Sequence, residues 1–213
     1  METKNTCGLS CVDCHVMNCR TMDKAWPGFC LTTDMEEGEL EAVMAKYEEP
    51  ENKRLSIASA EVEYEGYLKL TRVEEIIAVS KKMGYKKLGI ATCAGLIEES
   101  RILAKILRAH GFEVYSAICK VGGVEKSRIG IPAECESIGV NMCNPILQAE
   151  KLNKAGTDFN IVVGLCVGHD SLFYKYSDAM CTTMLTKDRV LGHNPAAALY
   201  GTSRYYARLL HGE

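Results

Sequence analysis

The sequence predicts an α/β fold, in which a parallel sheet carries helices on both faces in a Rossmann-like three-layer arrangement. Two observations predict it. From residue 86 onward, short apolar runs alternate with amphipathic helical patterns, which is typical of strands joined by crossover helices. Before that point the first 32 residues are rich in cysteine and poor in periodic pattern. We therefore expect a Cys-rich metal-binding module at 1–32, a helical segment packed on the core at 33–84, and an α/β domain with a second cysteine site at 85–213.

The Cys-rich module is too short to bury an apolar core of its own, so we expect a bound ligand to hold it. The helical segment is indicated by capping boxes and by an apolar stripe. Thr-x-x-Glu stretches at Thr33 and Thr71 have the spacing of the capping box that opens helices. Between them, apolar residues recur at helical spacing; they are Leu40, Val43, Met44 and Tyr47. Further helices are expected over 54–68 and 73–83, the latter stopped by Gly84.

The α/β domain contains four candidate strands and four candidate helices. The strands are short apolar runs, at 87–93, 112–119, 159–166 and 181–187. A helix with one apolar face follows the first strand and ends at Gly111. The other helices are expected at 144–156, 169–177 and from 194 to 210, the first and last of these opening on Asn-Pro. Residues 120–144 are predicted to form a long loop.

Composition excludes several classes of protein. The net charge is −3 and the charges are interspersed, so no nucleic-acid partner is expected. The longest apolar run, at 161–168, is far too short to span a bilayer. The N-terminus has no apolar h-region of a signal peptide, so a cytoplasmic location is expected. Eleven cysteines in a reducing compartment indicate metal ligation or thiol chemistry and not a disulfide framework.

The first cysteines lie in the stretch CGLSCVDCHVMNCR, and several sites fit parts of it. CVDCH matches the c-type haem attachment pattern, but haem attachment normally follows export and no export signal is present. Cys7, Cys11 and Cys14 have the C-x3-C-x2-C spacing of radical-SAM enzymes, although those enzymes place it after a first barrel strand. The favoured interpretation is a four-cysteine site of Cys11, Cys14, Cys19 and Cys30, with Cys7 as a spare.

Four thiolates suit either Zn²⁺ or a [4Fe–4S] cluster. Zinc ribbons usually carry two C-x2-C knuckles and this stretch has one, which favours iron–sulfur. The simplest alternative is that the site only staples the N-terminal arm, because small modules need staples.

A second set of cysteines lies in the α/β domain. Cys93, Cys119 and Cys166 each end a predicted strand, and the carboxyl ends of parallel strands share one edge of a sheet, where ligands bind. Cys143 precedes a helix and is expected to join them from the loop. Cys93 and Cys143 both lie at predicted helix N-termini, where free N–H groups stabilise thiolates. The alternative is that each thiol is a small buried apolar residue.

Polar residues follow these cysteines. His169 comes three residues after Cys166 and is the candidate metal ligand, or acid and base. The turn TKDRVLGHNP brings Lys187, Arg189 and His193 together. Such residues are usually solvated or cap helices, and we favour His169 over His193 for function.

The residues also resemble a known family. The stretch GLCVGHDSLFYKYSDAMCTTMLTKDRVLGHNPAAALY, with MCNPILQAEKLN and IATCAGLIEESRILAKILRAHGFEV before it, is similar to an uncharacterised family of cysteine-rich proteins of anaerobic bacteria and archaea that are regarded as metal-binding. The resemblance covers nearly the whole chain. It implies metal binding, with Cys11, Cys14, Cys19 and Cys30 on the family's C-x2-C-x4-C stretch and the cysteine after it. Cys93, Cys143 and Cys166 match its later motifs, and Cys119 falls at a matching strand end. Cys7 and Cys181 depart from the pattern, and the resemblance implies no reaction.

Three functions remain open. The first is an iron–sulfur protein with one or two [4Fe–4S] clusters, the cluster at the sheet edge serving redox, sulfur-transfer or Lewis-acid chemistry with a redox partner or small-molecule substrate. The second is a non-catalytic zinc- or iron-binding sensor or carrier. The third is a thiol or persulfide carrier, which the absence of closely spaced cysteines in the α/β domain disfavours. Whether the protein is an enzyme stays open.

Overall fold

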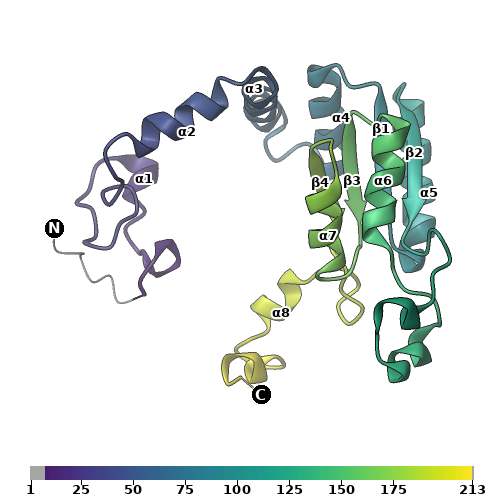
Figure 1. Ribbon diagram of the computed structural model, residues 1–213. Helices are drawn as coiled ribbons and strands as arrows, with labels where there is room; N and C mark the ends of the chain where they lie inside the picture. The colour runs from purple at the N-terminus through teal and green to yellow at the C-terminus, as the bar shows by residue number, and fades with distance from the viewer. Residues whose placement is uncertain (1–7, 213) are drawn as a thin grey trace. The chain divides into compact units, whose positions relative to one another are not determined.

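The structure is a computed structural model that describes residues 8–212 (Figure 1). Cys7 lies outside this range, and so does the N-terminal stretch on which the expectation of no signal peptide rests. The helices are α1 (Asn18–Thr21), α2 (Glu39–Tyr47), α3 (Pro50–Gly66), α4 (Arg72–Met83), α5 (Ile97–Ala109), α6 (Pro145–Ala155), α7 (His169–Tyr176) and α8 (Ala196–Tyr200). The strands are β1 (Lys87–Thr92), β2 (Glu113–Ile118), β3 (Phe159–Val163) and β4 (Cys181–Leu185). The chain forms two compact units that divide near residue 57, within α3.

The four strands form one parallel sheet in the order β2-β1-β3-β4. β1 is central, and Leu88 aligns with Val114 of β2 on one side and with Phe159 of β3 on the other. The predicted parallel α/β sheet is therefore confirmed. All six residues of β1 except the first are buried, as expected for a strand covered on both faces.

Helices cover both faces of this sheet. Alternate side chains of β1, such as Leu88 and Ile90, pack in a cluster with Ile77 of α4 and Leu107 of α5. Ala91 points the other way, into a second cluster built from α6 and α7. Because side chains alternate along a strand, the two clusters are separate cores on the two faces of the sheet. Figure 1 shows α6 and α5 on opposite sides of the strands.

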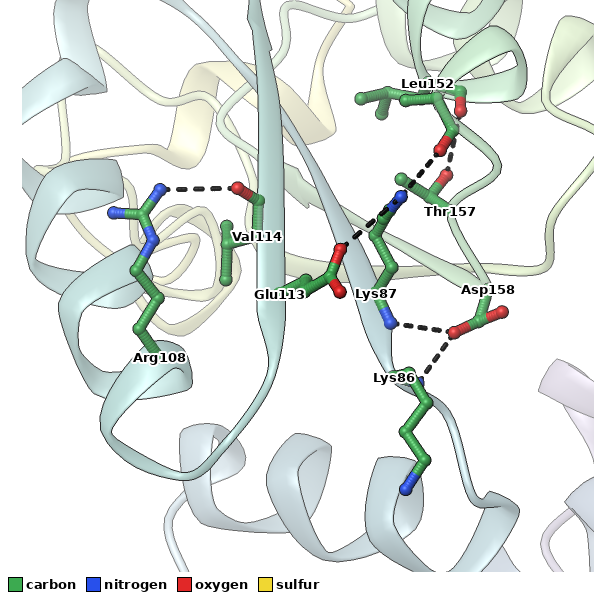
Figure 2. Close-up of polar contacts among 9 residues, drawn as sticks. Lys86, Lys87, Arg108, Glu113, Val114, Leu152, Thr157 and Asp158 are labelled. Atoms are coloured by element: carbon green, nitrogen blue, oxygen red, sulfur yellow. Dashed lines mark hydrogen bonds and ion pairs between the residues drawn. The ribbon is translucent and has the colours of Figure 1, made fainter.

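The amino edge of the sheet is tied together by polar contacts (Figure 2). The carboxylate of Asp158 accepts hydrogen bonds from the backbone N–H groups of Lys86 and Lys87, at 2.7 and 2.8 Å. The ammonium of Lys87 lies 3.5 Å from the carboxylate of Glu113. These contacts join the starts of β1, β2 and β3, so the polar side chains named here are paired with one another across the edge.

The carboxyl edge carries the segment 120–144, which is more ordered than the loop we predicted. It contains two 3-10 helices, Lys126–Ile129 and Ala133–Ile138. A bridge between Glu125 and Asn141 closes its base, and the buried ammonium of Lys126 donates to the carbonyl of Cys135. The segment is therefore a compact, internally bonded unit beside the ends of the strands.

The N-terminal unit lacks an apolar core. Among residues 8–57 no apolar side chain is buried, and the stripe on α2 is about half exposed, from 43% at Val43 to 50% at Leu40. The expected helix start at Thr33 is wrong: the hydroxyl of Thr33 donates to the carbonyl of Cys30, and α2 begins only at Glu39. The capping box at Thr71 is confirmed, since α4 begins directly after it.

The end of the chain also differs from the prediction. The helix expected from 194 to 210 stops at Tyr200 and gives way to turns and a 3-10 helix at Ala207–Leu210. Leu199, Tyr205 and Leu210 are more than half exposed, so little burial supports a continuous helix, and most helical stability in proteins comes from such packing. No helix within residues 8–212 is long and apolar enough to cross a membrane.

Candidate functional site: a row of thiols at the carboxyl edge of the sheet

Backbone hydrogen bonds of the sheet position the cysteines of the second set. Cys93 follows β1 directly and Cys119 follows β2 directly. The N–H of Cys119 donates to the carbonyl of Thr92 at 2.8 Å, and the carbonyl of Cys119 accepts the N–H of Asn144 at 2.7 Å. These bonds bring the end of β1, the end of β2 and the start of α6 together. Cys143, which precedes Asn144, is thereby held beside Cys119.

Three thiols and one imidazole form a continuous row. The thiol of Cys119 hydrogen-bonds to the sulfurs of Cys93 and Cys143, and His169 hydrogen-bonds to Cys143. The sulfur of Cys119 also accepts the N–H of Ala94 at 3.3 Å. Cys93 is 8% and Cys119 2% exposed, so the row lies just under the surface. We refer to Cys93, Cys119, Cys143 and His169 as the thiol row.

The row separates into two thiolates around one protonated thiol. The hydrogen bond from Cys119 is the main cause that lowers the pKa of Cys93 to about 5, with further help from the N–H of Gly95 and from Lys187. The pKa of Cys143 is lowered to about 4, first by Cys119 and then by His169. The pKa of Cys119 is raised, because its proton is held by Cys143 and Cys93 on either side. One S–H can donate to only one acceptor at a time, so the proton of Cys119 is shared between its neighbours.

Cations surround the thiolates. The hydrogen bond with Cys143 raises the pKa of His169, which favours an imidazolium beside a thiolate. Lys120 lowers the pKa of Cys143 by its charge, while its ammonium donates to the carbonyl of Asn141 at 2.6 Å. Lys187 acts on Cys93 in the same way and also hydrogen-bonds to it. Negative charge at this edge is therefore compensated from several elements.

Cys166 is held apart from the row by an arginine. Its sulfur accepts a hydrogen bond from the guanidinium of Arg189 at 3.1 Å. This hydrogen bond is the main cause that raises the pKa of Arg189, and the charges of Cys93 and Cys143 add to it more weakly, so the guanidinium lies within electrostatic reach of three sulfurs. Cys166 lines the same cavity as the thiol row. The structure thus gathers all four predicted cysteines at one edge, three of them in contact.

The buried amide of Gln148 underlies this edge. Its Nε2 donates to the carbonyls of Ala117, at 2.7 Å, and Thr92, at 3.1 Å. Thr92 directly precedes Cys93, and Ala117 lies two residues before Cys119. The Oε1 of Gln148 has no hydrogen-bond partner within the described chain. A fully buried polar side chain at this place holds the ends of β1 and β2 in register with α6.

The sequence interpretation did not single out several residues that the structure places here. Cys135 lines the cavity from the segment 120–144, and its place was not evident because no strand or helix end marks it. Lys187 and Arg189 were grouped with ordinary turn residues. His193 accepts the N–H of Asp188 at 3.1 Å and stabilises that turn. The strand-end rule, applied to β4, could have flagged Lys187 and Arg189, which follow it closely.

The N-terminal cysteines occupy exposed turns. Cys11 and Cys19 are exposed, and Cys14 and Cys30 are partly exposed. The sulfur of Cys14 accepts the N–H of Met17 at 3.4 Å. Although partial burial opposes it, hydrogen bonds from Thr32 and Thr33 lower the pKa of Cys30. All ten described cysteines are free.

Neither set of cysteines forms a ready-made metal cage. Within the described part of the chain, no group of three or more His, Cys, Asp or Glu side chains is arranged to hold a metal ion. The thiol row is held by hydrogen bonds between neighbours, and Cys166 is turned to Arg189. Metal binding at either set would therefore involve new side-chain rotamers.

Comparison with known proteins places the chain in a family. Residues 30–184 match the family described as "Protein of unknown function (DUF1847)". This range begins at Cys30 and contains the thiol row and Cys166. The chain is also 52% identical over 171 residues to a protein of Methanocaldococcus jannaschii named "Uncharacterized protein MJ0455", with 80% of this chain and 88% of that protein covered. The chain belongs to the DUF1847 family.

Proposed function

We propose that the protein binds metal through its cysteines, with an iron–sulfur cluster at the carboxyl edge of the sheet. The observation that carries the proposal is the thiol row itself. Cys93, Cys119 and Cys143 come from three separate parts of the chain, and Cys119 hydrogen-bonds to the other two, with Cys166 beside the same cavity. Thiolates are the ligands that both iron–sulfur clusters and zinc prefer.

The chemistry of the donor atoms at this edge fits a cluster, although their side chains do not yet converge on one point. Two of the thiols have pKa values low enough to be thiolates at neutral pH, and metal ligands must be deprotonated. Lys120, Lys187 and Arg189 offset the negative charge of such a site. The ligand side chains would have to turn toward one point, as expected where ligands order together with the metal.

A cluster here would supply redox, sulfur-transfer or Lewis-acid chemistry. The side chains of the protein would do the rest. His169 holds a proton at the end of the row, where it can pass it to a molecule in the cavity. Arg189 holds the sulfur of Cys166 beside the cavity by a hydrogen bond. The adjoining cavity gives a small molecule access to the centre, which a purely structural site would not need.

We further propose a second site at Cys11, Cys14, Cys19 and Cys30, holding either a [4Fe–4S] cluster or Zn²⁺. The lack of buried apolar side chains in residues 8–57 supports it, because a segment without a core needs another source of stability. Its role would be structural or that of an electron relay to a redox partner. The ten cysteines within residues 8–212 are free, which suits the reducing cytoplasm as the working compartment.

Metal analysis of anaerobically purified protein tests the proposal. We expect a brown protein with acid-labile sulfide and about four iron per occupied site. Cys93→Ala and Cys166→Ala should remove the iron of the sheet edge and leave metal at the N-terminal site, while Cys14→Ala should do the reverse. Cys181→Ala is the matched control, since its thiol donates to the carbonyl of Ala179 away from the row.

The outcomes separate the candidate functions. A colourless protein with stoichiometric zinc would support the non-catalytic sensor or carrier instead. Loss of both metals in Cys93→Ala would mean that the two sets form a single site. Protein that holds neither iron nor zinc after anaerobic reconstitution would refute metal binding altogether.

A further inference from the structure

A cavity of about 910 Å³ adjoins the thiol row. Small-molecule sites generally have volumes of about 300 to 1,000 Å³, so this one can enclose a molecule of metabolite size. Cys93, Cys119, Cys143, Cys166 and His169 line one part of it, and residues between 124 and 146 line much of the rest. Any molecule in the cavity would touch the proposed reactive centre.

The wall formed by the segment 120–144 carries a cluster of apolar side chains. Ile129 and Ile138, the two most exposed isoleucines of that wall, are 63% and 84% exposed, although the backbone around them is held by the bridge between Glu125 and Asn141. The neighbouring apolar lining residues are Val124, Ile131, Met142 and Leu172. Apolar side chains gathered around a concave surface are typical of a ligand site.

Apart from the thiolates of Cys93 and Cys143, the charged side chains of the lining are basic. They are Lys120, Lys126, Arg128 and Arg189, and no Asp or Glu from residues 8–212 lines the cavity. Lys120 and Lys126 each donate to a backbone carbonyl, and Arg189 donates to Cys166. The guanidinium of Arg128 has no partner among the described residues, and is free to take an anionic group in two hydrogen bonds.

The lining also disfavours other ligands. It contains no Phe, Tyr or Trp from the described chain, so a nucleobase or flavin would find no aromatic side chain to stack on. A cation is disfavoured because the four basic side chains and the imidazolium of His169 outnumber the two thiolates. The combination that remains is an anionic head group with an aliphatic body.

We propose that this cavity binds a small amphipathic anion, with a carboxylate on Arg128 and an aliphatic chain against Ile129 and Ile138. The inference rests on the proposed function in one respect, since it names the substrate class of that same site. Binding of the anion itself requires only the cavity, so it can be measured whether or not metal is present.

Octanoate is the probe, measured by isothermal titration calorimetry with the anaerobically purified full chain. We expect saturable binding of one octanoate, and at least tenfold weaker binding of octan-1-ol, which lacks the charge, and of acetate, which lacks the chain. Arg128→Gln should weaken octanoate binding at least tenfold and leave octan-1-ol unchanged. Ile138→Ser, at a position too exposed to disturb folding, should weaken both. Arg101→Gln, on the outer surface of α5, is the matched control and should bind octanoate as the wild type does.

Equal binding of octanoate and octan-1-ol, or unchanged octanoate binding in Arg128→Gln, would overturn the inference. Iron and zinc are measured in the same samples. Octanoate binding by protein that holds neither iron nor zinc after anaerobic reconstitution would refute the proposed metal function and keep this inference. A metal-loaded protein that fails to bind octanoate would refute this inference and leave the proposed metal function in place.

Discussion

The proton that Cys119 shares with its neighbours leads to a quantitative prediction for the pKa of Cys93. Cys119→Ala removes the hydrogen bond that is the main cause of the low pKa of Cys93, which falls from an ordinary 9.0 to about 5. A hydrogen bond to a charged group contributes about 1.5 to 3 kcal/mol, which is about one to two pKa units. Because this bond is the largest of the causes, we expect the pKa of Cys93 to rise by about two units in the variant, the upper end of that range. Gly95 and Lys187 keep the remainder of the shift.

The assay is the rate of alkylation of Cys93 by iodoacetamide as a function of pH. It is followed by peptide mass spectrometry in metal-free protein kept under reducing, oxygen-free conditions. Cys119→Ser is the control, because its hydroxyl can still donate a proton to the thiolate and should preserve most of the shift. A Cys119→Ala profile that superimposes on the wild type would refute the reasoning. Equal shifts in the Ala and Ser variants would show that packing, and not the hydrogen bond, sets the pKa.

Three further variants test the frame around the site. Gln148→Leu removes two buried hydrogen bonds and should lower the free energy of unfolding by about 2 kcal/mol in urea denaturation. Gly164→Ala should lower it by about 3 kcal/mol or more, since the residue has φ +65° and a Cβ would lie 1.8 Å from Cδ1 of Leu96. His169→Asn removes an imidazolium that the Cys143 thiolate stabilises. Because the hydrogen bond with Cys143 raises the pKa of His169 in the folded state, the contribution of His169 to stability is full below the ordinary imidazole pKa of about 6.5 and is lost as pH rises through the raised value. The stability difference from wild type should therefore narrow as pH rises.

Gly164→Ala has a matched control, and each of the three variants has a contradicting result. Gly111 has φ +91°, but nothing lies within 4 Å of the Cβ that Gly111→Ala would add. This variant isolates backbone strain, and its loss of stability should be smaller than that of Gly164→Ala. Equal losses would mean that contact with Leu96 does not matter. Unchanged stability of Gln148→Leu would contradict its role in joining the strand ends. A pH-independent difference for His169→Asn would show that no ion pair forms with Cys143.

Much of the fold followed from local patterns. The strands β1 to β4 and the helices α4 to α7 lie within a few residues of their predicted ranges, since burial on both faces of a sheet imposes long apolar runs on its strands. The two clear failures, the start of α2 and the end of α8, lie where few apolar side chains are buried. There the local signal had no packing to support it, and local preferences alone are weak.

What the sequence alone determined was the meeting of Cys93, Cys119, Cys143 and Cys166 at one edge, because every parallel strand ends on the same side of the sheet. What the tertiary structure alone decided was the state of each thiol and the shape of the space beside them. Whether a thiol keeps its proton depends on donors within hydrogen-bond distance, such as Lys187 and His169, which come from other elements. Such distances emerge only when the layers have packed, because neither spacing nor periodicity specifies how side chains from separate elements approach one another.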